Sequence, residues 1–207
     1  SASQELPTLY AQQVANTMAD ESHLLIYTTE KSPVSHPIVD EKKTMPLEPM
    51  QQATFESVTW PATVKRIKNI VAVNAKKGAS FSCILDGLKS VNTGLANAVK
   101  EENTYLLILS DMLECCELGC PKKAKDFSEM KKKLEKSNLN AASLASRIPQ
   151  DHIKICLISK EAKPENAAMI GSPEFQNFWN EAFKMLGYSG MPEPGTSIES
   201  FLELIND

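Results

Sequence analysis

The stretch TYLLILSDMLECCELGC, residues 104 to 120, carries the strongest strand signal in the chain and then runs into an aspartate and three cysteines. Its first seven residues are apolar on both alternating faces, which is typical of a strand buried on both sides in a parallel sheet. A second run of this kind, HIKICLIS, covers residues 152 to 159. We therefore expect both strands in one parallel sheet, with the strand at 104 to 110 in a central position.

Helical patterns surround these strands. Apolar side chains recur at helical spacing over residues 5 to 19, after Trp60, from Ser80 to Val99, from Asp126 to Ile148, from Ser172 to Gly187 and after Thr196. Ser80 and Ser172 stand where N-caps are expected. The alternation of helix and strand predicts a three-layer α/β/α sandwich with a mainly parallel central sheet and Rossmann-like topology.

The region between the first helix and Trp60 is less regular. HLLIYTTE, residues 23 to 30, has strand chemistry, whereas residues 31 to 56 hold four prolines among charges and no sustained period. We interpret 31 to 56 as an irregular surface excursion, with one edge strand around 53 to 59. At 207 residues the chain has the length of one large domain, so we expect a single domain over residues 1 to 207.

Composition excludes two classes of partner. The formal net charge is -4, so no overall basic field attracts a phosphate backbone, and we expect no nucleic-acid partner. The longest apolar run, Tyr105 to Leu109, is far shorter than the roughly 20 residues of a membrane-spanning helix. We expect a soluble chain without a membrane span.

The amino terminus points to a trimmed chain. It opens on SASQELP, without an initiator methionine and without the basic region or apolar core of a signal peptide. Removal of upstream residues leaves a secreted or surface origin open, and the localisation stays unknown. Five cysteines are an odd number, so at least one thiol stays unpaired within the chain.

Three short motifs follow one another along the chain, each at the start of a helix or at the end of a strand. Ser1 to Ser3 read SAS ahead of a long helix, Gly78 to Ser80 read GAS at the start of another, and Asp111 ends the strong strand within LILSDM. In this order the chain resembles a von Willebrand factor type A domain. That family's metal ion-dependent adhesion site takes Asp-x-Ser-x-Ser, then a threonine, then an aspartate from three loops at the carboxyl edge of the sheet.

The resemblance implies a divalent cation, Mg²⁺ or else Mn²⁺ or Ca²⁺, held by Ser1, Ser3, Ser80 and Asp111. Ser80 would replace the family's threonine, and Met112 stands where the family often has glycine. The family's first aspartate would lie just before Ser1, at the end of its first central strand. That strand is missing from residues 1 to 207, which should leave a gap in the middle of the sheet.

The residue chemistry supports the same site independently. Hard cations prefer oxygen ligands, and Mg²⁺ takes only one or two carboxylates while keeping several waters. The alternative is structural: Asp111 caps the following turn and Ser80 caps its helix, both ordinary roles for these residue types.

The cysteines allow several interpretations. Cys115, Cys116 and Cys120 form one irregular cluster without a second Cys/His pair nearby, which argues against zinc. A disulfide between Cys120 and one of the adjacent pair, or free thiols, remain open. Cys83 and Cys156 sit in apolar patterns, where they read as small buried hydrophobes.

We predict a binding module without catalytic residues, which docks a protein partner of unknown identity. This is what the resemblance implies, with or without the cation. The alternative from another class is a doubly wound α/β hydrolase or transferase that uses Asp111 and a rim cysteine. An enzyme of that kind needs a base beside its nucleophile, whereas the module needs only hydroxyls around Asp111.

Overall fold

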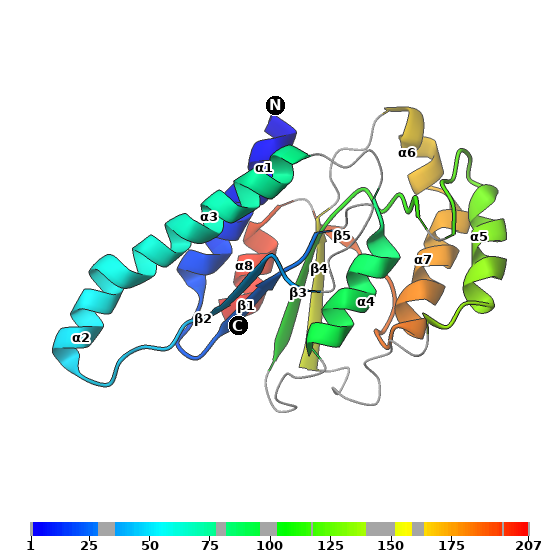
Figure 1. Ribbon diagram of the computed structural model, residues 1–207. Helices are drawn as coiled ribbons and strands as arrows, with labels where there is room; N and C mark the ends of the chain where they lie inside the picture. The colour runs from blue at the N-terminus through cyan, green and yellow to red at the C-terminus, as the bar shows by residue number, and fades with distance from the viewer. Residues whose placement is uncertain are drawn as a thin grey trace. The chain divides into compact units, whose positions relative to one another are not determined.

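A computed structural model describes most of the chain (Figure 1). The described residues are 2–28, 36–77, 82–95, 103–116, 118–139, 152–158, 164–195 and 197–206. The chain forms two compact units, of which the first comprises Ser1–Thr28 and His36–Gly78 and the second comprises Thr29–Ser35 and Ala79–Asp207. Both helices and strands occur, so the chain is of mixed α/β class. The single domain expected over residues 1 to 207 stays a prediction.

The first unit is a helical pair with a two-stranded antiparallel sheet. Its elements are α1 (Ala2–Thr17), β1 (His23–Ile26), β2 (Val39–Lys42), α2 (Pro49–Thr54), the π-helical turn η1 (Phe55–Thr59) and α3 (Trp60–Lys77). Trp60, Val64, Ile67 and Val71 recur along one face of α3 and form its core with Ala15. The indole Nε1 of Trp60 donates to the Ala15 carbonyl at 3.1 Å, so the buried ring keeps a polar partner.

The edge strand predicted at 53 to 59 is wrong, because these residues continue one helical path from Pro49 to Lys77. Thr54, Val58 and Thr59 are β-branched, a residue type that is common in strands. In the structure the hydroxyls of Thr54 and Ser57 instead donate to carbonyls four residues earlier, which a helix permits. Phe55 stacks on Trp60 at 6.0 Å between ring centroids, and this aromatic contact with the core favours the helical turn.

The second unit contains a parallel three-stranded sheet and five helices within the described residues. Its elements are α4 (Ile84–Leu95), β3 (Thr104–Leu109), α5 (Asp126–Glu135), β4 (Ile153–Ile158), α6 (Pro164–Ile170), α7 (Pro173–Met185), β5 (Pro194–Gly195) and α8 (Glu199–Asn206). The strand order is β3-β4-β5, and β3 pairs with β4 from Thr104↔Ile153 to Leu109↔Ile158.

The parallel pairing of the two apolar strands is therefore confirmed. Within the described residues, β4 lies in the middle of the sheet and β3 lies at its edge, so the central position expected for residues 104 to 110 is not found there. The Ser172 cap of α7 is confirmed by a hydrogen bond of 3.2 Å from the Phe175 amide to the Ser172 hydroxyl. The predicted helix that begins near Asp126 ends at Glu135, and its expected continuation over 141 to 148 lies outside the described residues.

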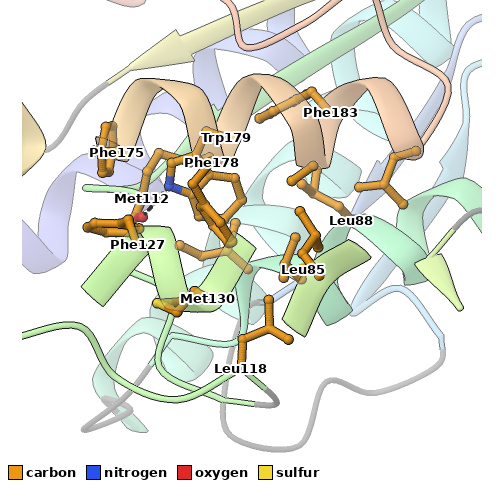
Figure 2. Close-up of a cluster of buried hydrophobic side chains, with 14 of the residues drawn as sticks. Leu85, Leu88, Met112, Leu118, Phe127, Met130, Phe175, Phe178, Trp179 and Phe183 are labelled. Carbon is orange, nitrogen blue, oxygen red and sulfur yellow. Dashed lines mark hydrogen bonds between the residues drawn. The ribbon is translucent and has the colours of Figure 1, made fainter. Parts of the chain in front are cut away.

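An aromatic cluster forms the core of the second unit (Figure 2). Phe127 of α5 meets Phe175 of α7 edge to face at 5.2 Å, and Phe178 meets Trp179 at 5.0 Å. Trp179 also reaches the loop after β3, where its Nε1 donates to the Met112 carbonyl at 2.9 Å. Helix α7 thereby holds the chain at the carboxyl end of β3.

Among the described residues, no helix is both long and apolar enough to cross a membrane.

The contact of Trp179 with Met112 can be tested by substitution. Trp179→Phe keeps most of the buried ring but leaves the Met112 carbonyl without its donor, so we expect the free energy of unfolding to fall by about 1 to 3 kcal/mol. Trp179→Ala also removes the ring and should cost about 3 to 5 kcal/mol. Urea unfolding followed by far-UV circular dichroism measures both. A Trp179→Phe chain as stable as the unchanged protein would contradict the role given to this hydrogen bond.

Candidate functional site

At the carboxyl end of β3 the chain makes two local turns, and a polar side chain stabilises each of them. The Ser110 hydroxyl accepts a hydrogen bond from the Met112 amide at 3.0 Å, and the Asp111 carboxylate accepts one from the Leu113 amide at 3.1 Å. Both are local turns in which a side chain bonds the backbone two residues on. The capping role considered for Asp111 is therefore present in the structure.

Met112 adopts an uncommon backbone conformation in this turn. Its φ is 59°, in the left-handed region that favours glycine, yet its side chain is fully buried. The buried thioether and the hydrogen bond from Trp179 hold the residue there. A glycine would adopt this backbone conformation without strain, whereas the methionine side chain fills a buried position in the core.

The segment after β3 meets the start of α4. Ser82 and Glu114 form a parallel β-bridge, and the Cys115 amide donates to the Ser82 carbonyl at 2.9 Å. A disulfide joins Cys83 to Cys116 in the same place. Two stretches about thirty residues apart in sequence therefore converge at residues 114 to 116, in the segment that follows Asp111.

Glu114 is the centre of this junction. Its side chain is fully buried, one oxygen accepts from the Leu85 amide at 2.9 Å and the other from the Cys116 amide at 3.1 Å. The Ile84 amide also bonds to it. These amides include the first ones of α4, which have no partner within the helix, so Glu114 caps α4 from a distant part of the chain.

Burial dominates the electrostatics of Glu114. Loss of hydration raises the pKa of its carboxyl above the ordinary value, and the amides of Leu85, Ile84 and Cys116 lower it in part. The nearby Asp86 carboxylate raises it further. This carboxyl therefore holds its proton to a higher pH than an exposed glutamate does.

Four of the five cysteines are paired. Beside Cys83–Cys116, a second disulfide joins Cys115 to Cys120 and closes a tight turn in which the Gly119 amide donates to the Cys116 carbonyl at 3.0 Å. One of the two pairings left open for Cys120 is therefore realised. Cys83 is buried as expected, but as a disulfide partner and not as a free thiol. Cys156 is free, and burial raises the pKa of its thiol.

Of the four expected metal ligands, Asp111 is the one whose side chain the structure describes. Ser1 and Ser80 lie outside the described residues, and so does the side chain of Ser3 in α1. Within the described ranges, no group of three or more His, Cys, Asp or Glu side chains is placed to hold a metal ion. A site built from serine hydroxyls and one carboxylate is of a different kind, so the cation stays a prediction.

Sequence reasoning missed Glu114 and the partner of Cys116. No local pattern marks Glu114, because its amide partners in α4 lie about thirty residues earlier in the chain. The vicinal cysteines were a signal, since two adjacent thiols rarely pair with each other and so suggest two separate partners.

Comparisons with protein-family models, with curated proteins and with solved structures find no match for this chain. The site is therefore interpreted from its own geometry.

The buried Glu114 predicts a distinctive pH dependence. The pKa of the Glu114 carboxyl is higher in the folded chain than in the unfolded chain, where it has its ordinary value of about 4.5. Proton binding by Glu114 therefore stabilises the folded state fully below the ordinary pKa. This stabilisation is lost as the pH rises through the pKa of the folded chain. The difference in unfolding free energy between the unchanged chain and Glu114→Gln should therefore fall with rising pH, by at most about 1.4 kcal/mol per pH unit for one proton. Urea titrations at several pH values measure it.

Asp126→Asn is the matched control. The Asp126 carboxylate is exposed, and the hydrogen bond from the Lys122 amide lowers its pKa in the folded chain. Its contribution to stability is therefore present above the pKa of the unfolded chain and is lost as the pH falls through the pKa of the folded chain. Its difference curve should run in the opposite direction. Curves of the same sign for both variants would refute the burial assigned to Glu114.

The two disulfides should differ in their contribution to stability. In the chain-entropy relation, the Cys83–Cys116 bond with its separation of 33 residues contributes about 4 kcal/mol, and the Cys115–Cys120 bond with a separation of 5 contributes about 2 kcal/mol. Paired alanine variants, Cys83→Ala with Cys116→Ala and Cys115→Ala with Cys120→Ala, test this by urea unfolding. Non-reducing peptide mapping checks the pairing itself, and a Cys83–Cys115 peptide would contradict it.

Proposed function

We propose that this chain is a protein-binding module similar to von Willebrand factor type A domains, with a three-layer α/β/α arrangement. It docks a protein partner at the edge that carries Asp111. A divalent cation, Mg²⁺ or else Mn²⁺ or Ca²⁺, held by Ser1, Ser3, Ser80 and Asp111, completes this edge. An acidic side chain of the partner would occupy the remaining coordination position.

One observation carries the proposal, namely the convergence of the start of α4 with the carboxyl end of β3. The Ser82–Glu114 bridge and the Cys83–Cys116 disulfide bring residues 82 and 83 beside the segment that follows Asp111. Ser80 precedes this bridge by two residues in sequence. Oxygen ligands from two loops at one sheet edge suit a hard cation. The edge is also where parallel sheets bind their ligands.

The turn at Asp111 leaves room for such a role. One carboxylate oxygen, Oδ1, accepts from the Leu113 amide, and the side chain is only half-buried. A carboxylate has about four lone-pair sites, so one turn hydrogen bond does not exhaust it. Structural capping and cation binding are therefore compatible in the same residue.

The enzymatic alternative has less support. It requires a rim thiol next to Asp111, and the three rim cysteines at positions 115, 116 and 120 are all in disulfides. A disulfide sulfur has no thiolate to act as a nucleophile. The remaining thiol, Cys156, lies inside strand β4 and not at its carboxyl end. A binding role needs no such group.

Calorimetric titration with Mg²⁺, Mn²⁺ and Ca²⁺ tests the cation. Asp111→Asn keeps an oxygen that can accept from the Leu113 amide but removes the charge, so we expect the fold to keep its stability while cation binding weakens by at least about tenfold. Asp111→Ala should lose both cation binding and the turn hydrogen bond. Asp126→Asn, which removes another exposed carboxylate, should bind as the unchanged chain does.

Two results would count against the cation. An unchanged chain that gives no binding heat with any of the three ions would leave Asp111 with its turn-capping role alone. Equal binding by the unchanged chain and Asp111→Asn would place the ion elsewhere.

A further inference from the structure

The two disulfides of the second unit differ in how far solvent reaches them. Cys83 is 1% exposed, whereas Cys120 is exposed. Their partners, Cys116 and Cys115, are both half-buried. Reduction of a disulfide requires a thiolate to approach one of its two sulfurs directly. A thiol from solution therefore reaches the Cys115–Cys120 bond at Cys120, while the Cys83 side of the other bond is closed to it.

The turn between Cys115 and Cys120 is held by contacts other than its disulfide. The Gly119 amide donates to the Cys116 carbonyl at 3.0 Å, and Leu118 is buried in the core of the unit. Lys133 of α5 reaches this turn, where its Nζ donates to the Leu118 carbonyl at 3.1 Å. None of these contacts uses a sulfur atom, so opening the disulfide leaves them in place.

The backbone at each of the two cysteines is anchored as well. The Cys115 amide donates to the Ser82 carbonyl at 2.9 Å. Just after Cys120, the Lys122 amide donates to the Asp126 carboxylate at 2.8 Å. The Cα atoms of Cys115 and Cys120 are 4.1 Å apart. Because backbone contacts hold this spacing, the two thiols of a reduced pair stay close together and can pair again.

The turn also carries a positive charge that favours thiol chemistry. The Lys133 ammonium lies against Leu118, and a Cβ atom built on Gly119 would be 4.0 Å from it. Both the attacking and the leaving species in disulfide exchange are thiolates. A lysine ammonium close to them attracts the first and stabilises the second.

Loop length separates the roles of the two disulfides. A disulfide stabilises a fold by restraining the unfolded chain, and this restraint grows with the length of the closed loop. The Cys115–Cys120 bond spans 5 residues, and the Cys83–Cys116 bond spans 33. Exposed disulfides are also the labile ones, whereas structural disulfides resist reduction. The structure therefore combines a long-range staple with a short, accessible bond.

We propose that Cys115–Cys120 is a reversible modification site, which exchanges with a dithiol reductant while Cys83–Cys116 stays oxidised. A thiolate of the reductant attacks Cys120 Sγ, the disulfide breaks, and Cys115 leaves as a thiolate that takes up a proton. The second thiol of the reductant then attacks its own sulfur in the mixed disulfide. Cys120 leaves with the electron pair and takes up a proton, and the reductant ends as a disulfide.

This modification uses no residue of the expected cation site. It therefore does not rest on a cation at Asp111 or on a protein partner at that edge.

Timed alkylation tests the proposal on the unchanged chain. The folded protein is treated with dithiothreitol as the dithiol, and the thiols that appear are labelled with iodoacetamide and located by tandem mass spectrometry. We expect labelling of Cys115 and Cys120 at least about tenfold faster than that of Cys83 and Cys116. The far-UV circular dichroism spectrum should stay unchanged at that stage. Oxidised glutathione should then restore the Cys115–Cys120 pair.

Three results would overturn the proposal. The first is equal labelling rates for the two disulfides. The second is loss of the circular dichroism signal when only Cys115 and Cys120 are labelled, since the bond would then be a structural staple. The third is re-oxidation that fails to restore this pair.

A matched pair of lysine variants tests the role of charge. Lys133→Gln should slow reduction of Cys115–Cys120 by at least about threefold at low ionic strength, and added salt should slow the unchanged chain but not this variant. Lys132→Gln removes a neighbouring charge that faces the space between α5 and α7, so it should react as the unchanged chain does. Equal rates for Lys133→Gln and Lys132→Gln would overturn the role given to Lys133.

Discussion

A buried carboxylate holds the second unit together at the point where its function is expected. Glu114 is removed from water, and its hydration is replaced by the amides of Ile84, Leu85 and Cys116. Such a group is tolerated only where donors are already aimed at it, and the first turn of a helix provides them. The Cys83–Cys116 disulfide then keeps these donors in place. The position of the Asp111 turn depends on this junction.

Strand β3 presents two surfaces with different chemistry. Its carboxyl end is polar and internally satisfied, since Ser110 and Asp111 bond the following backbone. Along its length β3 is apolar and pairs with β4 through its backbone. The polar end suits a cation or an acidic side chain, as the proposed function requires.

Several elements followed from local chemistry. Ser172 caps α7 because a serine followed by proline at the first helical turn satisfies the helix start without help from elsewhere. The two apolar runs pair in parallel because strands covered by helices must be apolar on both faces. Residues 53 to 59 were misread, since their β-branched character was outweighed by the contact of Phe55 with Trp60. The helix at Ile84 starts under a cap that Glu114 provides from about thirty residues away in sequence.

The sequence by itself determined the mixed α/β class, the helices other than α2, η1 and α6, the parallel direction of β3 and β4, and the aspartate at the end of the strong strand. These features depend on hydrophobic period and on residues close in the chain. Only the tertiary structure decided that Cys116 pairs with Cys83, that Glu114 caps α4, and that Met112 takes a left-handed backbone. Each of these depends on a partner distant in sequence, and local propensity carries no information about distant partners.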